Sequence, residues 1–329
     1  MTSPYGNGPT LVTLSVTPAS ANPVLDPVTQ EFLDRLPTAS PPTLQAFREQ
    51  LGVLQGNPPA VPHAPGEDLT ITAGRAGAIR MRILRPRTGA SRLPVIAYFS
   101  GGGTGGIRTH DRLLRELAAG SDAAVILIEE GHAAEHPLPE RIERNYAVLA
   151  EIAARAAGLG LDETRLAVAG DGIGGTLAAA VCLMARERQG PDICLQLLFC
   201  PVMACGCDTP SYRMFGNGPW LTRDVMRSLL AEYGVPEIAA DSRAFPASAS
   251  IRQLEGLPAA MVVTAENDVL RDEGETYARK LMQAGVAVHS TRFIGAIHDF
   301  ILLDALSETP AAQSALAQAI AALRVSFGK

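Results

Sequence analysis

Lysine and aromatic residues are scarce in this sequence, and long apolar runs are missing from it. Two of the 329 residues are lysine (Lys280 and Lys329), aromatic side chains make up 5%, and the formal net charge is −6. Such a chain has no basic stripe for a phosphate backbone, so we expect no nucleic-acid partner. The first twenty residues carry neither a charged n-region nor a long apolar segment, which predicts no signal peptide and no membrane span. We therefore expect a cytoplasmic protein that does not bind membranes.

Cysteine is also rare, and its spacing excludes a disulfide-stapled domain. The five cysteines are odd in number and include no Cys-x-x-Cys pair, which indicates reduced thiols. Cys205 and Cys207 are separated by a single residue, which is too tight for an ordinary zinc knuckle. The sequence therefore predicts no metal and no cofactor. The cysteines are Cys182, Cys194, Cys200, Cys205 and Cys207.

The remaining composition is that of a folded protein with a sizeable core. Hydrophobic residues make up 47% of the chain and charged residues 19%, whereas disorder requires low hydrophobicity and high charge. No repeat of about 20 to 50 residues is visible, which excludes solenoids and propellers. The length allows two domains of roughly 150 residues, or one larger α/β domain with an accessory segment.

Residues 1–65 and residues 66–329 have different patterns. The first stretch is rich in proline and turn formers, with short helical patterns at 26–36 and 42–54, and we interpret it as an N-terminal arm that contributes to a cap. The second stretch alternates strands and helices, which predicts βαβ units and a mostly parallel sheet with helices on both faces. The alternation breaks at about 205–245, and such an insertion is expected to form a helical cap over the sheet. We expect strands at 69–73, 79–84, 94–99, 123–128, 166–169, 194–199, 259–264 and 287–293, and helices at 111–120, 139–158, 173–188, 271–284 and 311–326.

Three segments whose residues could take part in a reaction follow predicted strands. Ser100–Gly103 comes after the strand that ends at Phe99, and Gly170–Gly175 lies between a strand and a helix. The third place is a pair, Asp268 and His298, each just beyond one of the last two strands. Open α/β sheets place their sites at the carboxyl ends of their strands. We therefore expect these residues to meet in one cavity.

At these residues the chain resembles the hormone-sensitive-lipase-like carboxylesterases and lipases of the α/β-hydrolase superfamily. In that family a His-Gly-Gly-Gly loop provides amides for an oxyanion, a Gly-Asp-Ser-Ala-Gly-Gly turn carries the nucleophile, and an Asp and a His follow in that order. The segments Glu135–Pro139, Leu254–Pro258 and Asp268–Gly274 are also similar to family motifs. The resemblance spans about residues 70–329. It implies an α/β-hydrolase fold with a helical cap.

The departures from the family pattern surround the expected catalytic centre. Gly172 stands where the family has its nucleophilic serine, and Ser100 stands where the loop has its histidine. Asp299 replaces the glycine that usually follows the catalytic histidine, and Glu130-Gly131 replaces Tyr-Arg. A glycine has no side chain to acylate. Four changes around one cavity favour natural divergence, and a single inactivating substitution of the serine stays the alternative.

The resemblance also implies roles for the residues that remain. Backbone N–H groups of Gly102, Gly103 and Ile173 would form the oxyanion hole. Asp268 would orient the imidazole of His298, which would act as general base or acid. Loss of the nucleophile of a serine hydrolase costs about 10⁶ in turnover. We therefore expect a reaction without a covalent intermediate, such as elimination, cyclisation, C–C cleavage or lactone opening, on a small molecule with a carbonyl or ester group.

Other interpretations of the same residues stay open. One alternative is that the chain is a carboxylesterase inactivated by a Ser-to-Gly change. Another is that it is a ligand-binding pseudoenzyme. Ser100, as a replacement nucleophile, and Asp171 and Glu130 are further residues that we place at the cavity. Gly170–Gly175 would suit a phosphate, but it lacks the Gly-Lys-Ser/Thr of a P-loop. The sequence leaves the oligomeric state open, a homodimer included.

Overall fold

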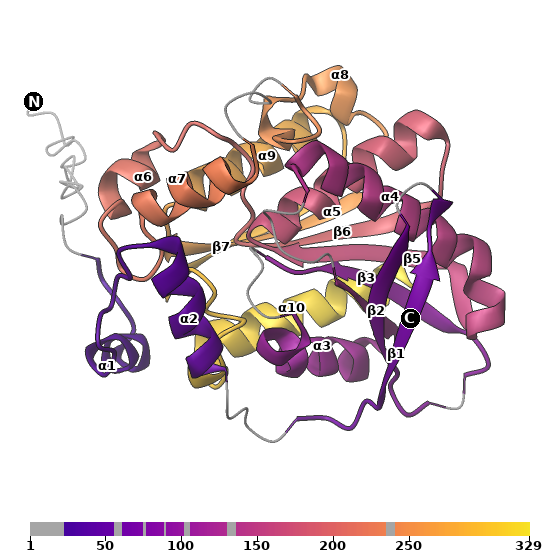
Figure 1. Cartoon of the computed structure of the whole chain (residues 1–329), viewed down its shortest axis with the longest axis horizontal. Coiled ribbons are helices and arrows are strands. Elements are labelled where there is room, and N and C mark those ends of the chain that lie inside the picture. Colours follow the sequence, from indigo (N-terminus) through magenta and orange to yellow (C-terminus); the bar gives the residue numbers. More distant parts are fainter. Residues whose placement is uncertain are drawn as a thin grey trace, which may run out of the picture.

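The computed structural model describes residues 23–55, 61–74, 77–88, 90–101, 106–129, 136–234 and 241–329. Within these residues an eight-stranded sheet forms the centre. Its strands are β1 (Gly66–Thr72), β2 (Ala78–Leu84), β3 (Leu93–Phe99), β4 (Ala124–Glu129), β5 (Leu161–Asp171), β6 (Ile193–Phe199), β7 (Ala259–Asn267) and β8 (Val288–Ile297). Their order across the sheet is β1-β2-β4-β3-β5-β6-β7-β8 (Figure 1). The β1–β2 and β2–β4 pairs are antiparallel, and the other five pairs are parallel.

The burial of the strands follows their place in the sheet. All seven residues of β3 are buried, because a parallel strand in the middle of such a sheet is covered on both faces. β1 lies at an edge, and its residues are mostly exposed. A continuous apolar run therefore marks the centre, and an alternating polar strand marks the rim. The predicted α/β-hydrolase architecture with a mostly parallel sheet is confirmed.

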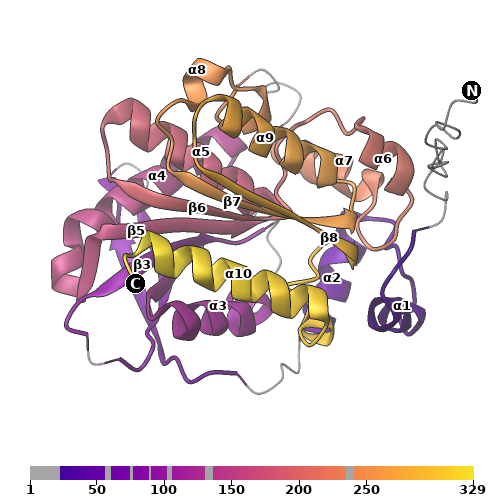
Figure 2. The same ribbon diagram turned by 180° about the vertical axis from the view of Figure 1, so that it is seen from behind.

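Helices cover both faces of the sheet, as Figure 1 and Figure 2 show. On one face α3 (Ile107–Ser121) packs against α10 (Pro310–Ser326). On the other face lie α4 (Leu138–Arg155), α5 (Ile173–Arg188) and α9 (Arg271–Gln283), and the short α8 (Ile251–Leu254) packs against α9. α5 is buried along most of its length, as its apolar sequence on all sides requires.

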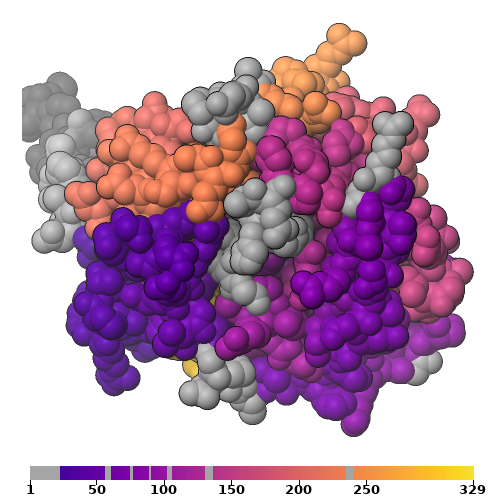
Figure 3. Space-filling view, viewed as in Figure 1, coloured from indigo at the N-terminus to yellow at the C-terminus, as the bar shows by residue number. Residues whose placement is uncertain are grey.

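Four further helices lie beyond the sheet. They are α1 (Pro27–Asp34), α2 (Leu44–Leu54), α6 (Pro210–Phe215) and α7 (Arg223–Glu232). α1 begins after Asp26, whose carboxylate accepts hydrogen bonds from the first turn, as N-cap aspartates do. α2 packs against α7, and Arg48 pairs with Glu232 at 2.9 Å. Figure 3 shows the two stretches adjoining on one face, the N-terminal helices in indigo and the insertion in orange. The N-terminal stretch and the insertion thus contact each other.

Several elements differ in length from the sequence prediction, and β5 and α4 are two examples. The strand expected at 166–169 extends from Leu161 to Asp171, because Leu161 pairs with Leu93 of β3 and the last two residues pair with β6. The helix expected at 139–158 leaves the α-helical form at Arg155 and continues as a 3₁₀ turn over Ala156–Leu159. Neither difference moves a residue of the site.

The cysteines and the helices concern two further expectations, which are reduced thiols and the absence of a membrane span. All five cysteines are free thiols, and three of them, Cys182, Cys200 and Cys207, are buried. Among the helices of the described residues, none is long and apolar enough to cross a bilayer.

Candidate active site

A tight turn joins β5 to α5 and contains Gly170, Gly172 and Gly174. A Cβ atom at Gly170 would collide with the backbone of Gly174, and one at Gly174 would collide with the backbone of Phe99. Gly172 differs, because a Cβ atom there would meet no atom of the described residues within 4 Å, although its φ of 50° is unfavourable for other residues. Hydrogen bonds hold its backbone on both sides, to the oxygen of Phe199 at 3.1 Å and from the N–H of Val202 at 2.9 Å. The turn is therefore rigid and has open space where a side chain would begin.

The loops after β7 and β8 bring Asp268 and His298 together. His298 Nδ1–H donates to Asp268 Oδ2 at 2.8 Å, and the N–H of Leu270 donates to Asp268 Oδ1 at 3.0 Å. Both side chains are buried. The pair fixes the orientation of the imidazole and leaves its Nε2 atom for a second partner.

That second partner is Asp299, whose role the sequence did not predict. Its Oδ1 atom lies 3.3 Å from His298 Nε2, and its Oδ2 atom accepts from Trp220 Nε1–H at 3.4 Å. Asp299 has a φ of 63°, a left-handed conformation that suits glycine and, less often, aspartate. Its appearance at the family's glycine position was the only signal in the sequence.

The two carboxylates set the charge of His298. Burial lowers the pKa of its imidazole, but Asp268 and Asp299 outweigh burial, so the pKa lies well above the ordinary value. Burial raises the pKa of Asp299, and repulsion by Asp171 adds to it, while His298 opposes the shift. The neighbouring acidic side chains thus favour the protonated form of the His298 imidazole. In this state His298 is a proton donor rather than a base.

Asp171 belongs to a second buried cluster beneath the turn. Tyr98 donates to Asp171 Oδ1 at 2.8 Å, His110 Nε2 lies 3.0 Å from the same atom, and the N–H of Gly101 donates to Oδ2 at 3.2 Å. Burial raises the pKa of Asp171, but His110 and Tyr98 outweigh it, and the pKa lies below its usual range. The carboxylate is therefore ionised and largely occupied by these donors.

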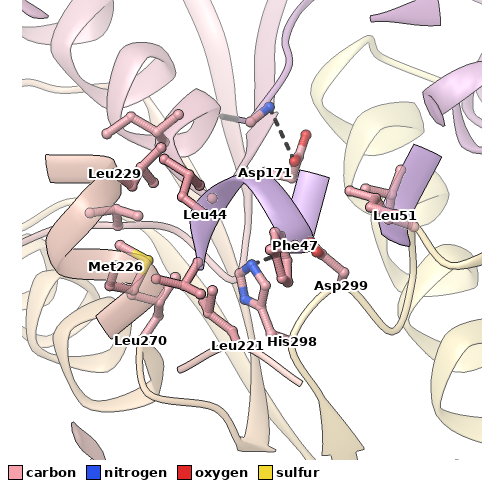
Figure 4. Close-up of a pocket in the computed structure, with 16 residues that line it drawn as sticks. Leu44, Phe47, Leu51, Asp171, Leu221, Met226, Leu229, Leu270, His298 and Asp299 are labelled. Atoms are coloured by element: carbon pink, nitrogen blue, oxygen red, sulfur yellow. Dashed lines mark hydrogen bonds and ion pairs between the residues drawn. The ribbon is translucent and has the colours of Figure 1, made fainter. Parts of the chain in front are cut away.

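One cavity unites these groups, with a volume of about 40 Å³, more than the roughly 10–15 Å³ that one water requires. Gly172, Ile173, Asp171, His298 and Asp299 line it, and the rest of its wall is mainly aliphatic. Figure 4 shows this wall, to which both the N-terminal stretch and the insertion contribute. The other lining residues are Leu44, Phe47, Leu51, Gly101, Val202, Leu221, Val225, Met226, Leu229, Leu270 and Leu302. Such a wall favours a small, uncharged ligand.

The other predicted site residues fall in different places. Ile173 is the first residue of α5 and lines the cavity, and an N–H at this position has no partner within the helix. Ser100 follows β3 and is not among the described residues that line the cavity. Gly102, Gly103 and Glu130 lie outside the described residues. The oxyanion roles of the two glycines and the position of Glu130 stay predictions.

Cys200 lies close to Asp268 and His298, and its thiol is hydrogen-bonded to the imidazole of His298. Its Sγ atom, one oxygen of Asp268 and one nitrogen of His298 lie within 4.8 Å of one another, the one such group of potential metal ligands in the described residues. Asp268 and His298 already bind each other at 2.8 Å, so a metal would have to break that hydrogen bond. Burial raises the pKa of the Cys200 thiol to about 11. The thiol is therefore neutral and a poor ligand.

Comparison with known proteins places this geometry in a family. A family model of the alpha/beta hydrolase fold matches residues 96–302. The carboxylesterase NlhH of Mycobacterium tuberculosis is 34% identical over 314 residues, which cover 93% of this chain and 98% of that protein. A thermostable esterase from Pseudomonas putida matches in structure with a TM-score of 0.88 at 37% identity, over 93% of this chain and 98% of that chain. A hyperthermophilic esterase from Pyrobaculum calidifontis matches with a TM-score of 0.81 at 35% identity, over 92% and 98%. The chain therefore belongs to the α/β hydrolase fold family, in its hormone-sensitive-lipase-like carboxylesterase branch.

Proposed function

We propose that this protein opens the ester bond of a small, uncharged carboxylic ester or lactone by direct attack of water, without an acyl-enzyme. The observation that carries the proposal is the combination of Gly172, which has no nucleophile, with His298, which lines the same cavity and is bound to Asp268 behind it. The relatives named above are esterases, which favours an ester over the substrates of elimination or cyclisation. Retention of the pair speaks against a pure ligand-binding protein, which has no use for it.

The residues of the cavity supply what such a reaction needs. The N–H of Ile173 and the imidazolium of His298 stabilise the negative oxygen that forms when water adds to the carbonyl. His298 then donates a proton to the departing alcohol oxygen, which is the role of a general acid. Asp268 keeps the imidazole in position and stabilises its charge. Water occupies the space that the side chain of a serine would take.

Hydrolysis of phenyl acetate and δ-valerolactone, combined with intact-mass spectrometry, tests this proposal. We expect slow turnover above the uncatalysed rate, no acetylated protein during turnover, and a loss of about 10² to 10⁴ in kcat/KM for His298→Gln. An acetyl adduct that forms and decays at the rate of turnover would contradict it. So would an unchanged rate in the His298→Gln protein.

A second candidate is a carboxylesterase disarmed at one position, and the open space at Gly172 favours it. A serine would fit there sterically, in a strained turn such as the family uses for its nucleophile. If this candidate is correct, Gly172→Ser acquires esterase activity and forms an acetyl-enzyme with p-nitrophenyl acetate. Because Asp299 occupies Nε2 of His298, Gly172→Ser combined with Asp299→Gly belongs in the same assay. Gly172→Ala is the matched control, since it adds the Cβ atom without the hydroxyl. Silence of both serine variants would rule this candidate out.

A further inference from the structure

Asp299 lies on the side of His298 where a serine hydroxyl would otherwise bind. We propose that Asp299 is a catalytic residue of this site, whose carboxylate holds the attacking water and accepts its proton. The inference rests on the proposed function, since it assigns the base for the same hydrolysis. It concerns a side chain at which this chain departs from its family pattern.

The position of the carboxylate is the first argument. Asp299 follows His298 directly, and its left-handed backbone turns the side chain back toward the ring, with Oδ1 at 3.3 Å from Nε2. Figure 4 shows the two side chains facing each other, with the contact drawn between them. Both residues line the cavity next to Gly172. Because Asp299 and Gly172 line the same cavity, a water held in that cavity has access to the carboxylate.

The polar contacts of the Asp299 carboxylate leave it capacity for a water. Charge-assisted hydrogen bonds between nitrogen and carboxylate oxygen are usually about 2.7–2.9 Å long, and both contacts of Asp299 exceed 3.2 Å, at 3.3 Å to His298 and 3.4 Å to Trp220. Each oxygen has a second lone pair. Trp220 is fully buried, with its ring 5.1 Å from that of Phe47. The indole therefore fixes the carboxylate from the cap without saturating it.

The other carboxylates around the cavity fit the role less well. Asp171 accepts from Tyr98, His110 and the N–H of Gly101, and these partners lower its pKa. Asp268 does not line the cavity and is bound to Nδ1 of His298. Among the carboxylates that the structure describes at the cavity wall, Asp299 is thus the one with long polar contacts, one hydrogen bond to Trp220 and one ion-pair contact to His298.

The charged surroundings of Asp299 come from every element packed against it. They include the imidazole of His298 on its own loop, the carboxylates of Asp171 at the end of β5 and Asp268 after β7, and the indole of Trp220 from the cap. Tyr98 in β3, His110 in α3 and Cys200 after β6 also sense its charge. Burial, Asp171 and Asp268 raise the pKa of Asp299 and His298 opposes them, so the group is a stronger base than an ordinary carboxylate.

The reaction balances with water as the only co-reactant. The oxygen of the water forms a bond to the carbonyl carbon, its proton passes to Asp299, and the electron pair of the C=O bond moves to the oxyanion. When the intermediate collapses, the bond between the carbonyl carbon and the alcohol oxygen breaks, and that oxygen takes a proton from His298 Nε2. The proton on Asp299 then returns to His298. The products are a carboxylic acid and an alcohol.

The test compares Asp299→Asn and Asp299→Gly with the wild type on phenyl acetate. Asparagine keeps the shape and removes the basic oxygen, and glycine fits the left-handed backbone at this position. We expect both variants to lose about 10² to 10⁴ in kcat with little change in KM. Asp224→Asn is the matched control, because Asp224 is a carboxylate of the cap helix whose side chain is 79% exposed, and it keeps full activity. An unchanged or faster rate in Asp299→Gly would overturn the inference, and it would mean that Asp299 only keeps the substrate from Nε2 of His298.

The pH profile gives a readout that a purely structural role would not move. A general base must be ionised, so kcat/KM of the wild type falls as the pH falls through the raised pKa of Asp299. In Asp299→Asn this acid limb disappears from the residual rate, and its persistence would overturn the inference. A rate that falls in His298→Gln but not in Asp299→Asn overturns the inference alone. Absence of turnover by the wild type overturns the proposed function and the inference together.

Discussion

Two buried histidines lie near the turn after β5, and each is paired with an aspartate. His110 is fully buried, with Nε2 at 3.0 Å from Asp171 and Nδ1 at 2.8 Å from the hydroxyl of Thr109. His298 has a similar pair with Asp268, but it also lines the cavity. The pKa of both imidazoles is raised, because nearby carboxylates outweigh the effect of burial. The difference between them is access: a histidine–aspartate pair does chemistry only where one of its atoms meets the ligand.

The same comparison explains what the pair at His110 does. Its members come from three elements, Tyr98 from β3, His110 from α3 and Asp171 from the end of β5. Their hydrogen bonds join these elements directly beneath Gly172 and bring in the backbone of Gly101. We interpret this cluster as the support of the turn, and the His298 cluster as the reactive group above it.

Exchange of the two histidines for glutamine gives the largest expected difference. We expect His298→Gln to lose about 10² to 10⁴ in kcat/KM on phenyl acetate, because it removes the proton donor. His110→Gln keeps its activity within about a tenfold range, since its ring does not reach the cavity. Steady-state kinetics of the two proteins side by side measure this. Equal losses in both would show that the clusters act as one catalytic unit.

Removal of the carboxylate of Asp171 is expected to affect stability most. Asp171→Ala leaves His110 without its partner in a buried site, and breaking a buried ion pair costs about 3–5 kcal/mol. Urea denaturation followed by circular dichroism measures the free energy of unfolding. Asp224→Ala, at an exposed carboxylate of α7, is expected to stay within about 0.5 kcal/mol of the wild type. A small loss for Asp171→Ala would contradict a supporting role of the cluster.

Loss of one hydroxyl from the supporting cluster has a smaller expected effect. Tyr98→Phe removes the donor to Asp171 Oδ1, and a hydrogen bond to a charged group contributes about 1.5–3 kcal/mol. The ring keeps its packing, so we expect kcat/KM on phenyl acetate to change by less than about threefold. Denaturation and kinetics of one preparation check both parts. A large kinetic loss at unchanged stability would connect the cluster to the reaction itself.

The direction in which the free energy of unfolding changes with pH tests the role of His110 in the supporting cluster. The folded pKa of His110 is raised above its unfolded value, so its contribution is complete below about pH 6.5 and is lost as the pH rises through the folded pKa. The gap in unfolding free energy between the wild type and His110→Gln therefore shrinks above about pH 6.5, by about 1.4 kcal/mol for each unit of the shift. Urea denaturation at a series of pH values measures the gap. A gap that widens with pH would mean that His110 is buried in its neutral form.

Local patterns in the sequence were enough to predict the fold and to single out Asp268 and His298. The helix predicted at 173–188 matches α5, because small glycines and a continuous apolar run define it without long-range contacts. Asp268 and His298 could be placed at one edge of the sheet because each follows a predicted strand, and the carboxyl ends of parallel strands lie on the same side. Their convergence on Gly172 is a consequence of the parallel strand order.

The remainder of the site depends on contacts between distant residues. Tyr98, His110 and Asp171 carry no shared motif and meet only when β3, α3 and β5 pack together. Asp299 was visible as a departure from a family pattern, but its partners depend on a backbone φ of 63° and on Trp220 from the insertion. Periodicity and composition report neither of these.

The junction at Trp220 has an evolutionary consequence. Its indole packs against Phe32 and Phe47 of the N-terminal stretch and donates to Asp299 beside His298. The segments that form the aliphatic wall of the cavity therefore also hold the group that we assign as the base. In a chimera that carries the cap of a relative, we expect the basicity of Asp299 to change together with the ligand specificity. In this chain the basicity of Asp299 and the shape of the cavity depend on the same residue, Trp220, so we expect a substitution there to change both.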